Sequence, residues 1–261
     1  MQSFEYRTPN TTADALAAVA QEDARFIAGG QTLLQSMKLG LIAPSALVDL
    51  AGVAELKGIC RDGDAIVIGA ATSHAEVAAS AELRQAIPAL AALADQIGDR
   101  QVRHRGTLGG SLANNDPAAC YPAAVLGLGA TVHTHKRRIA ADDFFQGIYT
   151  TALDEGELIT AVSFPIPARA GWQKFRQPAS RFALVGVFVS QGPAGVRVAV
   201  TGAGSGGVFR ATALEQKLAA SWSAAALAGA SVPADDLVTD LHGSAAYRAA
   251  LIPELAARAV G

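Results

Sequence analysis

Short apolar runs alternate with polar turns over the first fifty residues, which indicates a small α/β unit. Thr11 and Thr12 offer N-cap side chains to the first of two helical segments. The pattern predicts strands at 4–6, 25–28 and 47–50 and helices at 13–20 and 32–39. This β-α-β-α-β order predicts a small sheet that contains parallel pairs of strands.

In the middle of the chain, the pattern predicts longer helices that alternate with single strands. Thr72 or Ser73 caps a helix, and Pro165 and Pro167 end an apolar strand. We expect further strands at 65–68, 131–135 and 157–167 and further helices at 88–98 and 122–130.

The segment 168–171 is a candidate domain boundary. Beyond it, 182–190 and 196–204 have the pattern of an antiparallel hairpin around the turn "QGPAG". The tail, 211–260, is rich in alanine and is expected to be largely helical.

Composition narrows the class of protein without deciding the function. The 261 residues, half of them apolar, suit one two-part domain or two small domains of an ordinary α/β or α+β protein. A formal net charge of −2 argues against a general nucleic-acid binder. The N-terminus lacks the features of a secretory signal, and no apolar run approaches the roughly 20 residues of a membrane span, so we expect a cytoplasmic protein. The two cysteines, Cys60 and Cys120, cannot supply the four thiolates of an iron–sulfur cluster.

Several possible sites have simpler explanations. The glycines of "GAGSGG", 202–207, satisfy G-x-G-x-x-G, but no second strand with an acidic end follows, so a plain loop is favoured. His133 and His135 share one face of a strand without an obvious third metal ligand, which favours an exposed hairpin face. The run "RQVRHR", 100–105, is either a solvated loop or a positive rim beside an anionic group. Ser36 and Ser111 lack the G-x-S-x-G setting of a nucleophile.

Two glycine pairs, Gly29-Gly30 and Gly109-Gly110, are each placed next to a predicted helix. Glycine tolerates positive φ and lets backbone N–H groups approach an anion closely. A turn that opens a helix adds a favourable dipole, so one such turn can hold one phosphate group. Two of them could hold a pyrophosphate from both sides, whereas the simpler interpretation is two structural turns. Spacing alone does not decide between these interpretations.

The residues around the two pairs resemble a known family. The segments "AGGQTLLQSMK" and "QVRHRGTLGGSLANNDPAACYPAAVLGLGATV" are similar to the two flavin-binding segments of the molybdenum hydroxylases, which include xanthine dehydrogenase, aldehyde oxidase and carbon monoxide dehydrogenase. The chain resembles their separate FAD-binding medium subunit. The likeness continues in order through "DDFFQGIYTTALDEGELITAVSFP" and "KFRQPASRFALVGV" to the tail "LHGSAAYRAALIPELAARAV" and covers nearly the whole chain.

The resemblance implies an α+β fold in two parts. Residues 1–168 would form the FAD-binding domain of the vanillyl-alcohol oxidase and cresol methylhydroxylase type, with two α/β subdomains that meet near 55–60. Residues 169–261 would form a C-terminal α+β domain with a three-stranded sheet and helices. FAD would lie between the subdomains and would be held without a covalent bond.

The resemblance also implies the residues that bind FAD. Those around the pyrophosphate would be Phe26, Ile27, Ala28, Gly29, Gly30, Gln31, Thr32, Leu33, Thr107, Leu108, Gly109, Gly110 and Ser111. Ile97 and Ile159 match positions that line the flavin or adenine end, Lys174 matches a lysine close to the flavin, and Phe182 would lie beside the flavin ring.

Cys120 departs from the family pattern. Many relatives have Asp or Glu at this position, where the carboxylate can bond the ribose or adenine of FAD. A thiol is a weak hydrogen-bonding group, so Asn115 and Asp116 are the alternative residues for this contact.

The resemblance implies an oxidoreductase subunit that never meets the organic substrate. A molybdenum-cofactor large subunit would oxidise the substrate, and a small subunit with two 2Fe–2S clusters would pass electrons to FAD, the three chains forming a dimer of heterotrimers. FAD would then reduce NAD, a quinone, O₂ or another acceptor. The alternatives are a stand-alone flavin oxidase, for which the C-terminal part is small as a substrate-binding cap, and a scaffold subunit without FAD.

Overall fold

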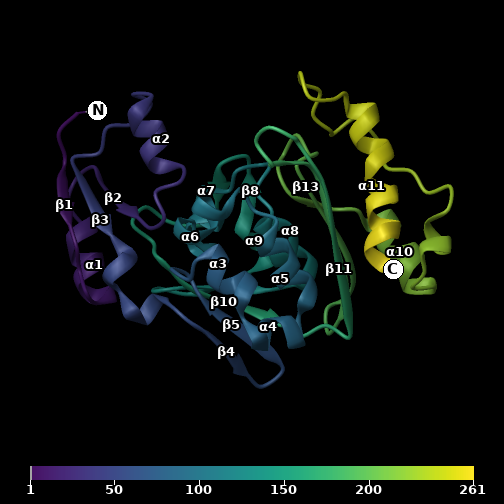
Figure 1. Cartoon of the computed structure of the whole chain (residues 1–261), viewed down its shortest axis with the longest axis horizontal. Coiled ribbons are helices and arrows are strands. Elements are labelled where there is room, and N and C mark those ends of the chain that lie inside the picture. Colours follow the sequence, from purple (N-terminus) through teal and green to yellow (C-terminus); the bar gives the residue numbers. More distant parts are fainter. Residues whose placement is uncertain (1) are drawn as a thin grey trace.

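The computed structural model describes residues 2–261 and shows three bodies in a row along the long axis of the molecule (Figure 1). The N-terminal body is a three-stranded parallel sheet of order β1-β3-β2, as the β-α-β-α-β pattern predicts. Its elements are β1 (Glu5–Arg7), α1 (Thr12–Val19), β2 (Ala24–Ile27), α2 (Leu33–Lys38) and β3 (Ala46–Asp49). Because its strands are parallel, β2 and β3 end at the same edge of the sheet, where α/β proteins form ligand crevices.

The middle body is a five-stranded antiparallel sheet of order β4-β5-β10-β6-β7, with helices packed against it. The strands are β4 (Ile59–Asp62), β5 (Ala65–Gly69), β6 (Thr131–Thr134), β7 (Arg138–Ala140) and β10 (Ile159–Pro165), and a separate hairpin comprises β8 (Phe145–Gly147) and β9 (Thr150–Thr151). The helices are α3 (His74–Ala79), α4 (Ala81–Ala86), α5 (Pro88–Asp95), α6 (Arg100–Arg105), α7 (Leu108–Asn114), α8 (Tyr121–Leu128) and α9 (Ala141–Phe144).

The C-terminal body is a sheet of order β11-β12-β13-β14 with two helices. Its strands are β11 (Arg169–Arg176), β12 (Ala183–Gly192), β13 (Gly195–Thr201) and β14 (Phe209–Arg210), and its helices are α10 (Thr212–Ala220) and α11 (Ala245–Val260). The expected β12–β13 hairpin is present, whereas the two-residue β14 adds a fourth strand to the expected three. The tail is less helical than predicted, since 228–244 contains no helix.

Strand β12 lies in the interior between two layers. Its first eight residues are buried, because one face packs with the middle body and the other packs with α11. Trp172 and Phe188 join the core of the middle body, while Val187 and Val189 belong to the core under α10 and α11. The continuous apolar run of β12 therefore reflects a sheet covered on both faces. Among residues 2–261, no helix has the length and apolar character needed to cross a bilayer.

Candidate functional site

The first glycine pair has the predicted strand–turn–helix setting, between β2 and α2. Gly30 has φ +69°, a backbone conformation that favours glycine. A Cβ on Gly29 would lie 2.1 Å from the carbonyl oxygen of Arg105, at the end of α6. Gly29 therefore allows the N-terminal body to touch the middle body directly at this point.

The segment that follows β2 offers unpaired hydrogen-bond donors. Within residues 2–261, the backbone N–H groups from Gly29 to Leu33 have no hydrogen-bond acceptor. Gln31 and Thr32 are exposed, and the Thr32 side chain makes no capping bond. Successive free N–H groups in a turn form a concave site for an anion, which suits a pyrophosphate.

The second glycine pair lies inside a helix, in the first turn of α7, and not in a turn that precedes it. Thr107 caps this helix and accepts the Gly110 N–H at 3.2 Å. The N–H groups of Leu108 and Gly109 donate to Thr72 and Ala70. These amides are already paired, so the two glycine pairs are not equivalent as donors.

The glycines of α7 instead create close packing and open space. A Cβ on Gly109 would lie 2.6 Å from the Cβ of Ala70, so Gly109 seats α7 on the end of β5. Gly110 is exposed, and a Cβ there would lie 3.7 Å from the Cβ of Ala28. The two predicted segments are thus neighbours, and Ser111 follows on the same helix. This surface supplies space and hydroxyl groups for a phosphate.

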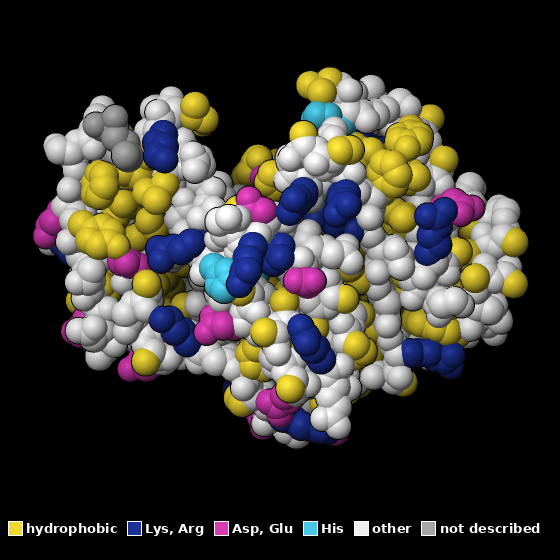
Figure 2. All heavy atoms as spheres, viewed as in Figure 1, with side chains coloured by type: hydrophobic (Ala, Val, Ile, Leu, Met, Phe, Trp, Pro, Cys, Tyr) yellow, Lys and Arg dark blue, Asp and Glu magenta, His cyan; other side chains and the backbone are white. Residues whose placement is uncertain are grey.

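A cleft of about 530 Å³ lies between the N-terminal and middle bodies, and both segments contribute to it through Ala28 and Thr107. Its other walls are Leu50, Ala51, Ala71, Ala75 and Ala79, with Lys57, Ser73, Glu76, His104 and Arg105 as polar residues. Ligand pockets span about 300–1,000 Å³ and are mostly apolar with a few polar groups. Small apolar walls beside cationic side chains suit a flat ring joined to phosphates, so the residues fit the adenosine half of FAD. In Figure 2, Lys and Arg side chains gather over the middle of the face of the molecule that is turned toward the viewer.

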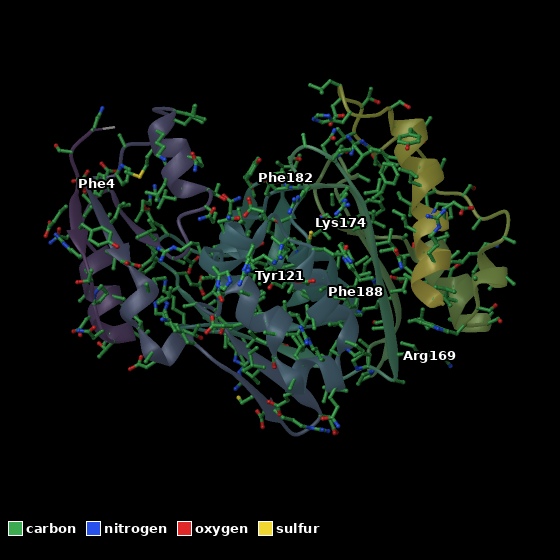
Figure 3. All side chains as sticks on the ribbon, viewed as in Figure 1. Phe4, Tyr121, Arg169, Lys174, Phe182 and Phe188 are labelled. Atoms are coloured by element: carbon green, nitrogen blue, oxygen red, sulfur yellow. The ribbon has the colours of Figure 1, made fainter. Side chains whose placement is uncertain are left out.

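A second group of predicted residues meets where α5 ends. The Lys174 ammonium donates to the Gln96 carbonyl at 2.9 Å and lies 3.2 Å from the Cys120 sulfur. Burial raises the pKa of the Cys120 thiol, and the nearby ammonium opposes this shift. Ile97 follows Gln96 and is partly buried, and Phe182 is 51% exposed on the neighbouring loop. Figure 3 shows Lys174 and Phe182 on the wall of the C-terminal body that faces the N-terminal body.

This contact bears on the roles that the resemblance implies. The resemblance places Cys120 at the ribose or adenine of FAD and Lys174 at the flavin. Two groups 3.2 Å apart cannot serve opposite ends of an extended FAD. At most one of these two assignments can be right.

Asn115 and Asp116 already have structural partners. Asn115 has φ 44°, and its amide donates to the carbonyls of Gly147 and Thr150 at 2.7 and 2.9 Å, so it anchors the β8–β9 hairpin. The Asp116 carboxylate accepts the Ala118 N–H at 2.8 Å. Asp116 is only partly buried and retains acceptor capacity, whereas the donors of Asn115 are used.

The apolar site residues lie behind the cleft. Ile27, Leu108 and Ile159 are buried in hydrophobic cores, and Phe26 and Leu33 pack against the cores of the N-terminal body. The structure therefore brings the two glycine segments together at the cleft and Ile97, Cys120, Lys174 and Phe182 together at the end of α5. It does not bring Ile159 to either surface.

Sequence reasoning missed a buried histidine beneath the second segment. A Cβ on Gly106 would lie 2.5 Å from the Nε2 of His74, so this ring supports the residue before Thr107. Burial, together with the charge of Arg103, lowers the pKa of His74 to about 4, so the ring is neutral at pH 7. The ring of Tyr121 lies 5.2 Å away. Within residues 2–261, neither the His74 Nδ1 nor the Tyr121 hydroxyl has a hydrogen-bond partner.

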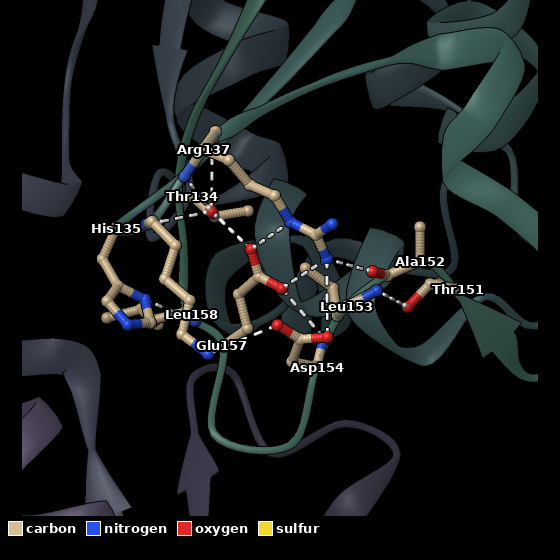
Figure 4. Close-up of polar contacts among 10 residues, drawn as sticks. Thr134, His135, Arg137, Thr151, Ala152, Leu153, Asp154, Glu157 and Leu158 are labelled. Carbon is tan, nitrogen blue, oxygen red and sulfur yellow. Dashed lines mark hydrogen bonds and ion pairs between the residues drawn. The ribbon is translucent and has the colours of Figure 1, made fainter.

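A second missed feature is the buried carboxylate of Glu157, just before β10. It accepts hydrogen bonds from Arg137 at 3.0 and 2.9 Å, from the Thr134 hydroxyl at 2.7 Å and from the Asp154 N–H at 2.8 Å (Figure 4). The Arg137 bonds are the main reason why the pKa of Glu157 falls to about 2. This network fixes the turn after β6 to the start of β10. The acid-rich "DEGE" run gave no indication of it.

The other candidates have structural explanations. His135 accepts the Leu158 N–H at Nδ1, and His133 pairs with the Ser163 hydroxyl at 2.9 Å. Residues 2–261 contain no group of three or more potential metal ligands. "GAGSGG" forms a loop after β13, as favoured, whereas "RQVRHR" forms helix α6 and not a loop. Asp99 explains this helix, because its side chain caps α6 by accepting the Val102 N–H.

Known proteins resemble the chain along nearly its whole length. Residues 2–167 match the family described as the FAD binding domain in molybdopterin dehydrogenase. The carbon monoxide dehydrogenase medium chain of Hydrogenophaga pseudoflava is 32% identical, over 98% of this chain and 96% of that protein. The nicotine 6-hydroxylase medium subunit of Paenarthrobacter nicotinovorans is 34% identical, over 100% of this chain and 97% of its own length.

Solved structures agree with these similarities. Reconstituted CO dehydrogenase from Oligotropha carboxidovorans contains a chain with a TM-score of 0.89 and 31% identity, covering 99% of this chain and 96% of that one. Quinoline 2-oxidoreductase from Pseudomonas putida 86 contains one with a TM-score of 0.87 and 30% identity at the same coverage. The predicted fold and family are therefore confirmed. The chain belongs to the FAD-binding domain family of the molybdopterin dehydrogenases and is the FAD-binding medium subunit of an oxidoreductase of the molybdenum hydroxylase type.

Proposed function

We propose that this chain is the electron-transfer subunit of a heteromeric molybdenum hydroxylase. A large partner subunit oxidises the substrate at its molybdenum cofactor, and a small partner subunit supplies electrons from two 2Fe–2S clusters. FAD held by this chain would supply the chemistry that takes up these electrons and delivers them as a pair to an external acceptor such as NAD, a quinone or O₂. The chain contributes binding and orientation. Its two cysteines could not ligate a cluster, which supports placing the clusters in a partner.

The observation that carries the proposal is that the backbone N–H groups after β2, which have no acceptor, lie next to a cleft lined by alanines. In the proposed arrangement, the N–H groups of Gly29–Leu33 hold the pyrophosphate, and Gly110 leaves room for it. Arg105 adds positive charge beside the phosphates, at the rim of the cleft that receives the adenosine half.

The flavin ring would then extend toward the end of α5. There Ile97, Cys120, Lys174 and Phe182 come from four separate segments of the chain. Lys174 offers its ammonium to the ring, while the buried Cys120 keeps water from one side. Of the two conflicting assignments, we favour placing both residues at the flavin end, because neither of them lines the cleft that would receive the adenosine half.

The proposed partner subunits are inferred from the relatives, which are themselves subunits of larger enzymes. Similar proteins are named as medium chains or subunits of carbon monoxide dehydrogenase and nicotine 6-hydroxylase. We therefore propose one molybdenum-cofactor large subunit and one 2Fe–2S small subunit for each copy of this chain, assembled as a dimer of heterotrimers.

Purification of the chain with and without the products of its neighbouring reading frames tests the proposal. We expect one FAD per chain in the absorption spectrum, flavin release on acid precipitation, and co-purification of molybdenum and iron with the complex. A flavin-free chain that still assembles with both partners would instead show a scaffold. A flavin-loaded chain that oxidises an organic substrate without partners would show a stand-alone oxidase.

A further inference from the structure

The side chain of Leu158 joins the two bodies that form the cleft. It is 4% exposed and belongs to the same apolar core as Val48 and Leu50, at the end of β3, and Ala71, after β5. Leu50 and Ala71 are also walls of the cleft, and Ala28, a third wall, packs against this core. Leu158 therefore lies in the core that supports three apolar walls of the cleft.

The ring of His135 fixes the backbone at Leu158. The His135 N–H donates to the Leu158 carbonyl at 3.0 Å, and the Leu158 N–H donates to the Nδ1 of His135 at 3.1 Å (Figure 4). The first bond joins two backbone groups, whereas the second requires a ring nitrogen that carries no proton. Gly156 brings the same turn against α1, since a Cβ there would lie 3.9 Å from the Cγ1 of Val19. We call the bond between the Leu158 N–H and His135 Nδ1 the latch.

A proton on the His135 ring would break the latch without forming an ion pair. The ring is exposed, so water and protons reach it. The turns around it carry both kinds of charge, from Lys136, Arg137, Arg138, Asp154, Glu155 and Glu157. Lys136 and Arg137 already pair with the carboxylates of Asp154 and Glu157, and within residues 2–261 no carboxylate oxygen lies within 4.0 Å of a His135 ring nitrogen. Protonated Nδ1 would instead become a donor that faces the Leu158 N–H.

We propose that the latch holds the N-terminal body closed over the adenosine half of FAD and that protonation of His135 releases it. His135 is then a positioning residue, which acts on FAD through Leu158. If only the closed chain binds FAD, the apparent affinity falls with the fraction of closed chains. Because histidine is the side chain that ordinarily changes charge between about pH 5 and pH 8, acid weakens FAD binding in this range. The inference rests on the proposed function and adds a control of its site by pH.

Two substitutions separate the acceptor from the proton. His135→Asn keeps an acceptor, the side-chain carbonyl, that does not titrate, and His135→Phe keeps a flat ring without an acceptor. His133→Asn is the matched control, because His133 lies two positions earlier and pairs with the Ser163 hydroxyl instead. The dissociation constant of FAD is measured by flavin fluorescence at about pH 8 and about pH 5 for each full-length chain. Circular dichroism checks that each chain is folded at both. His104 lines the cleft and is the same in every chain, so the comparison is made between variants.

Between these two pH values, FAD affinity should fall about fivefold more in wild type and in His133→Asn than in His135→Asn, the factor expected for one lost hydrogen bond. At the higher pH, His135→Phe should bind FAD about fivefold more weakly than wild type, for the same reason. An equal fall in wild type and His135→Asn would overturn the latch. So would wild-type affinity of His135→Phe at the higher pH.

A second measurement needs no flavin. In the FAD-free chain at about pH 7, hydrogen exchange of the Leu158 amide should be about fivefold faster in His135→Phe than in His135→Asn, because only the Phe variant lacks the acceptor. Equal exchange in the two variants would overturn the latch whether or not the chain binds FAD. A wild-type chain that protects this amide but binds no FAD at either pH would contradict the proposed function instead.

Discussion

The ammonium of Lys174 lies 3.2 Å from the sulfur of Cys120, although 54 positions separate them in the chain. Cys120 is 5% exposed, and burial raises the pKa of its thiol, so the sulfur is a weak and neutral acceptor. A carboxylate at this position would neutralise the ammonium, whereas the thiol leaves its charge available to a ligand. The presence of Cys rather than a carboxylate at position 120 therefore has an electrostatic consequence.

Replacement of Cys120 by Asp should lower the reduction potential of the bound flavin. The new carboxylate would pair with Lys174 and cancel the positive charge that favours the electron-rich flavin. A loss of about 1.4 kcal/mol in this interaction corresponds to about 30 mV for a two-electron couple. Reductive titration measures the shift, and Cys120→Ser, which adds no charge, is the matched control. A potential that is equal in the Asp and Ser variants would place Lys174 away from the flavin.

Gly30→Val should lose FAD, whereas Gly40→Val should retain it. Both glycines have positive φ, at +69° and +72°, so valine strains each backbone by a similar amount, about 1–2 kcal/mol. Only Gly30 lies among the free amides, while a Cβ on Gly40 meets no atom within 4 Å. Flavin per chain after gel filtration measures occupancy, and urea unfolding checks that the two variants are equally destabilised. Similar occupancy in both would remove Gly30 from the site.

Gly110→Val tests the second segment without the complication of positive φ. Its Cβ would lie 2.9 Å from the Thr107 hydroxyl and would fill the space beside Ala28. We expect weaker FAD binding together with a destabilisation of the flavin-free chain by about 1 kcal/mol, the scale of a disturbed N-cap, because the Thr107 hydroxyl must shift. If Gly30→Val and Gly110→Val both kept full occupancy, the assignment of the pyrophosphate site would be wrong.

Local sequence patterns predicted the architecture better than they predicted the donors. The parallel N-terminal sheet and the β12–β13 hairpin follow from periodicity, which depends on neighbours along the chain. The contact of Cys120 with Lys174 depends on how two bodies pack, so spacing could not reveal it. The paired amides of α7 were also hidden, since their acceptors, Ala70 and Thr72, follow a distant strand.

The buried groups illustrate the same limit. His74 and Glu157 sit among alanines and acids in the sequence, and nothing nearby marks them as buried. Their environment comes from α8 and from the turn after β6, and only the folded chain supplies it. The resemblance could name matching positions, but it could not say which amides are free.

Glu157 should make the free energy of unfolding of the chain depend on pH in the acid range. The pKa of its carboxyl group is about 2 in the folded chain, compared with 4.5 for an unperturbed glutamate. Because the folded pKa is the lower one, this stabilisation is fully present above about pH 4.5 and is lost as pH falls toward 2. Glu157→Gln should destabilise the chain by about 2 kcal/mol at pH 7, the scale of hydrogen bonds to a charged group. The difference from wild type should shrink as pH falls through this window, which urea unfolding at several pH values measures. A difference that stays constant between pH 5 and 2 would show that Glu157 does not titrate there.

Arg181 and Phe182 should control the flavin in two different ways. Arg181 has φ 62° and bonds the Gly98 carbonyl, so Arg181→Gly removes its charge while relieving backbone strain. We expect a lower flavin potential in Arg181→Gly and an unchanged one in Arg181→Lys, because lysine keeps the charge. Phe182→Ala should leave the potential nearly unchanged and speed reoxidation by O₂, since the exposed ring would otherwise cover one side of the flavin. Reductive titration and stopped-flow reoxidation in air-saturated buffer measure the two effects separately. If FAD-replete variants kept both the wild-type potential and the wild-type rate, this loop would lie away from the flavin, and Phe182 would have only a packing role.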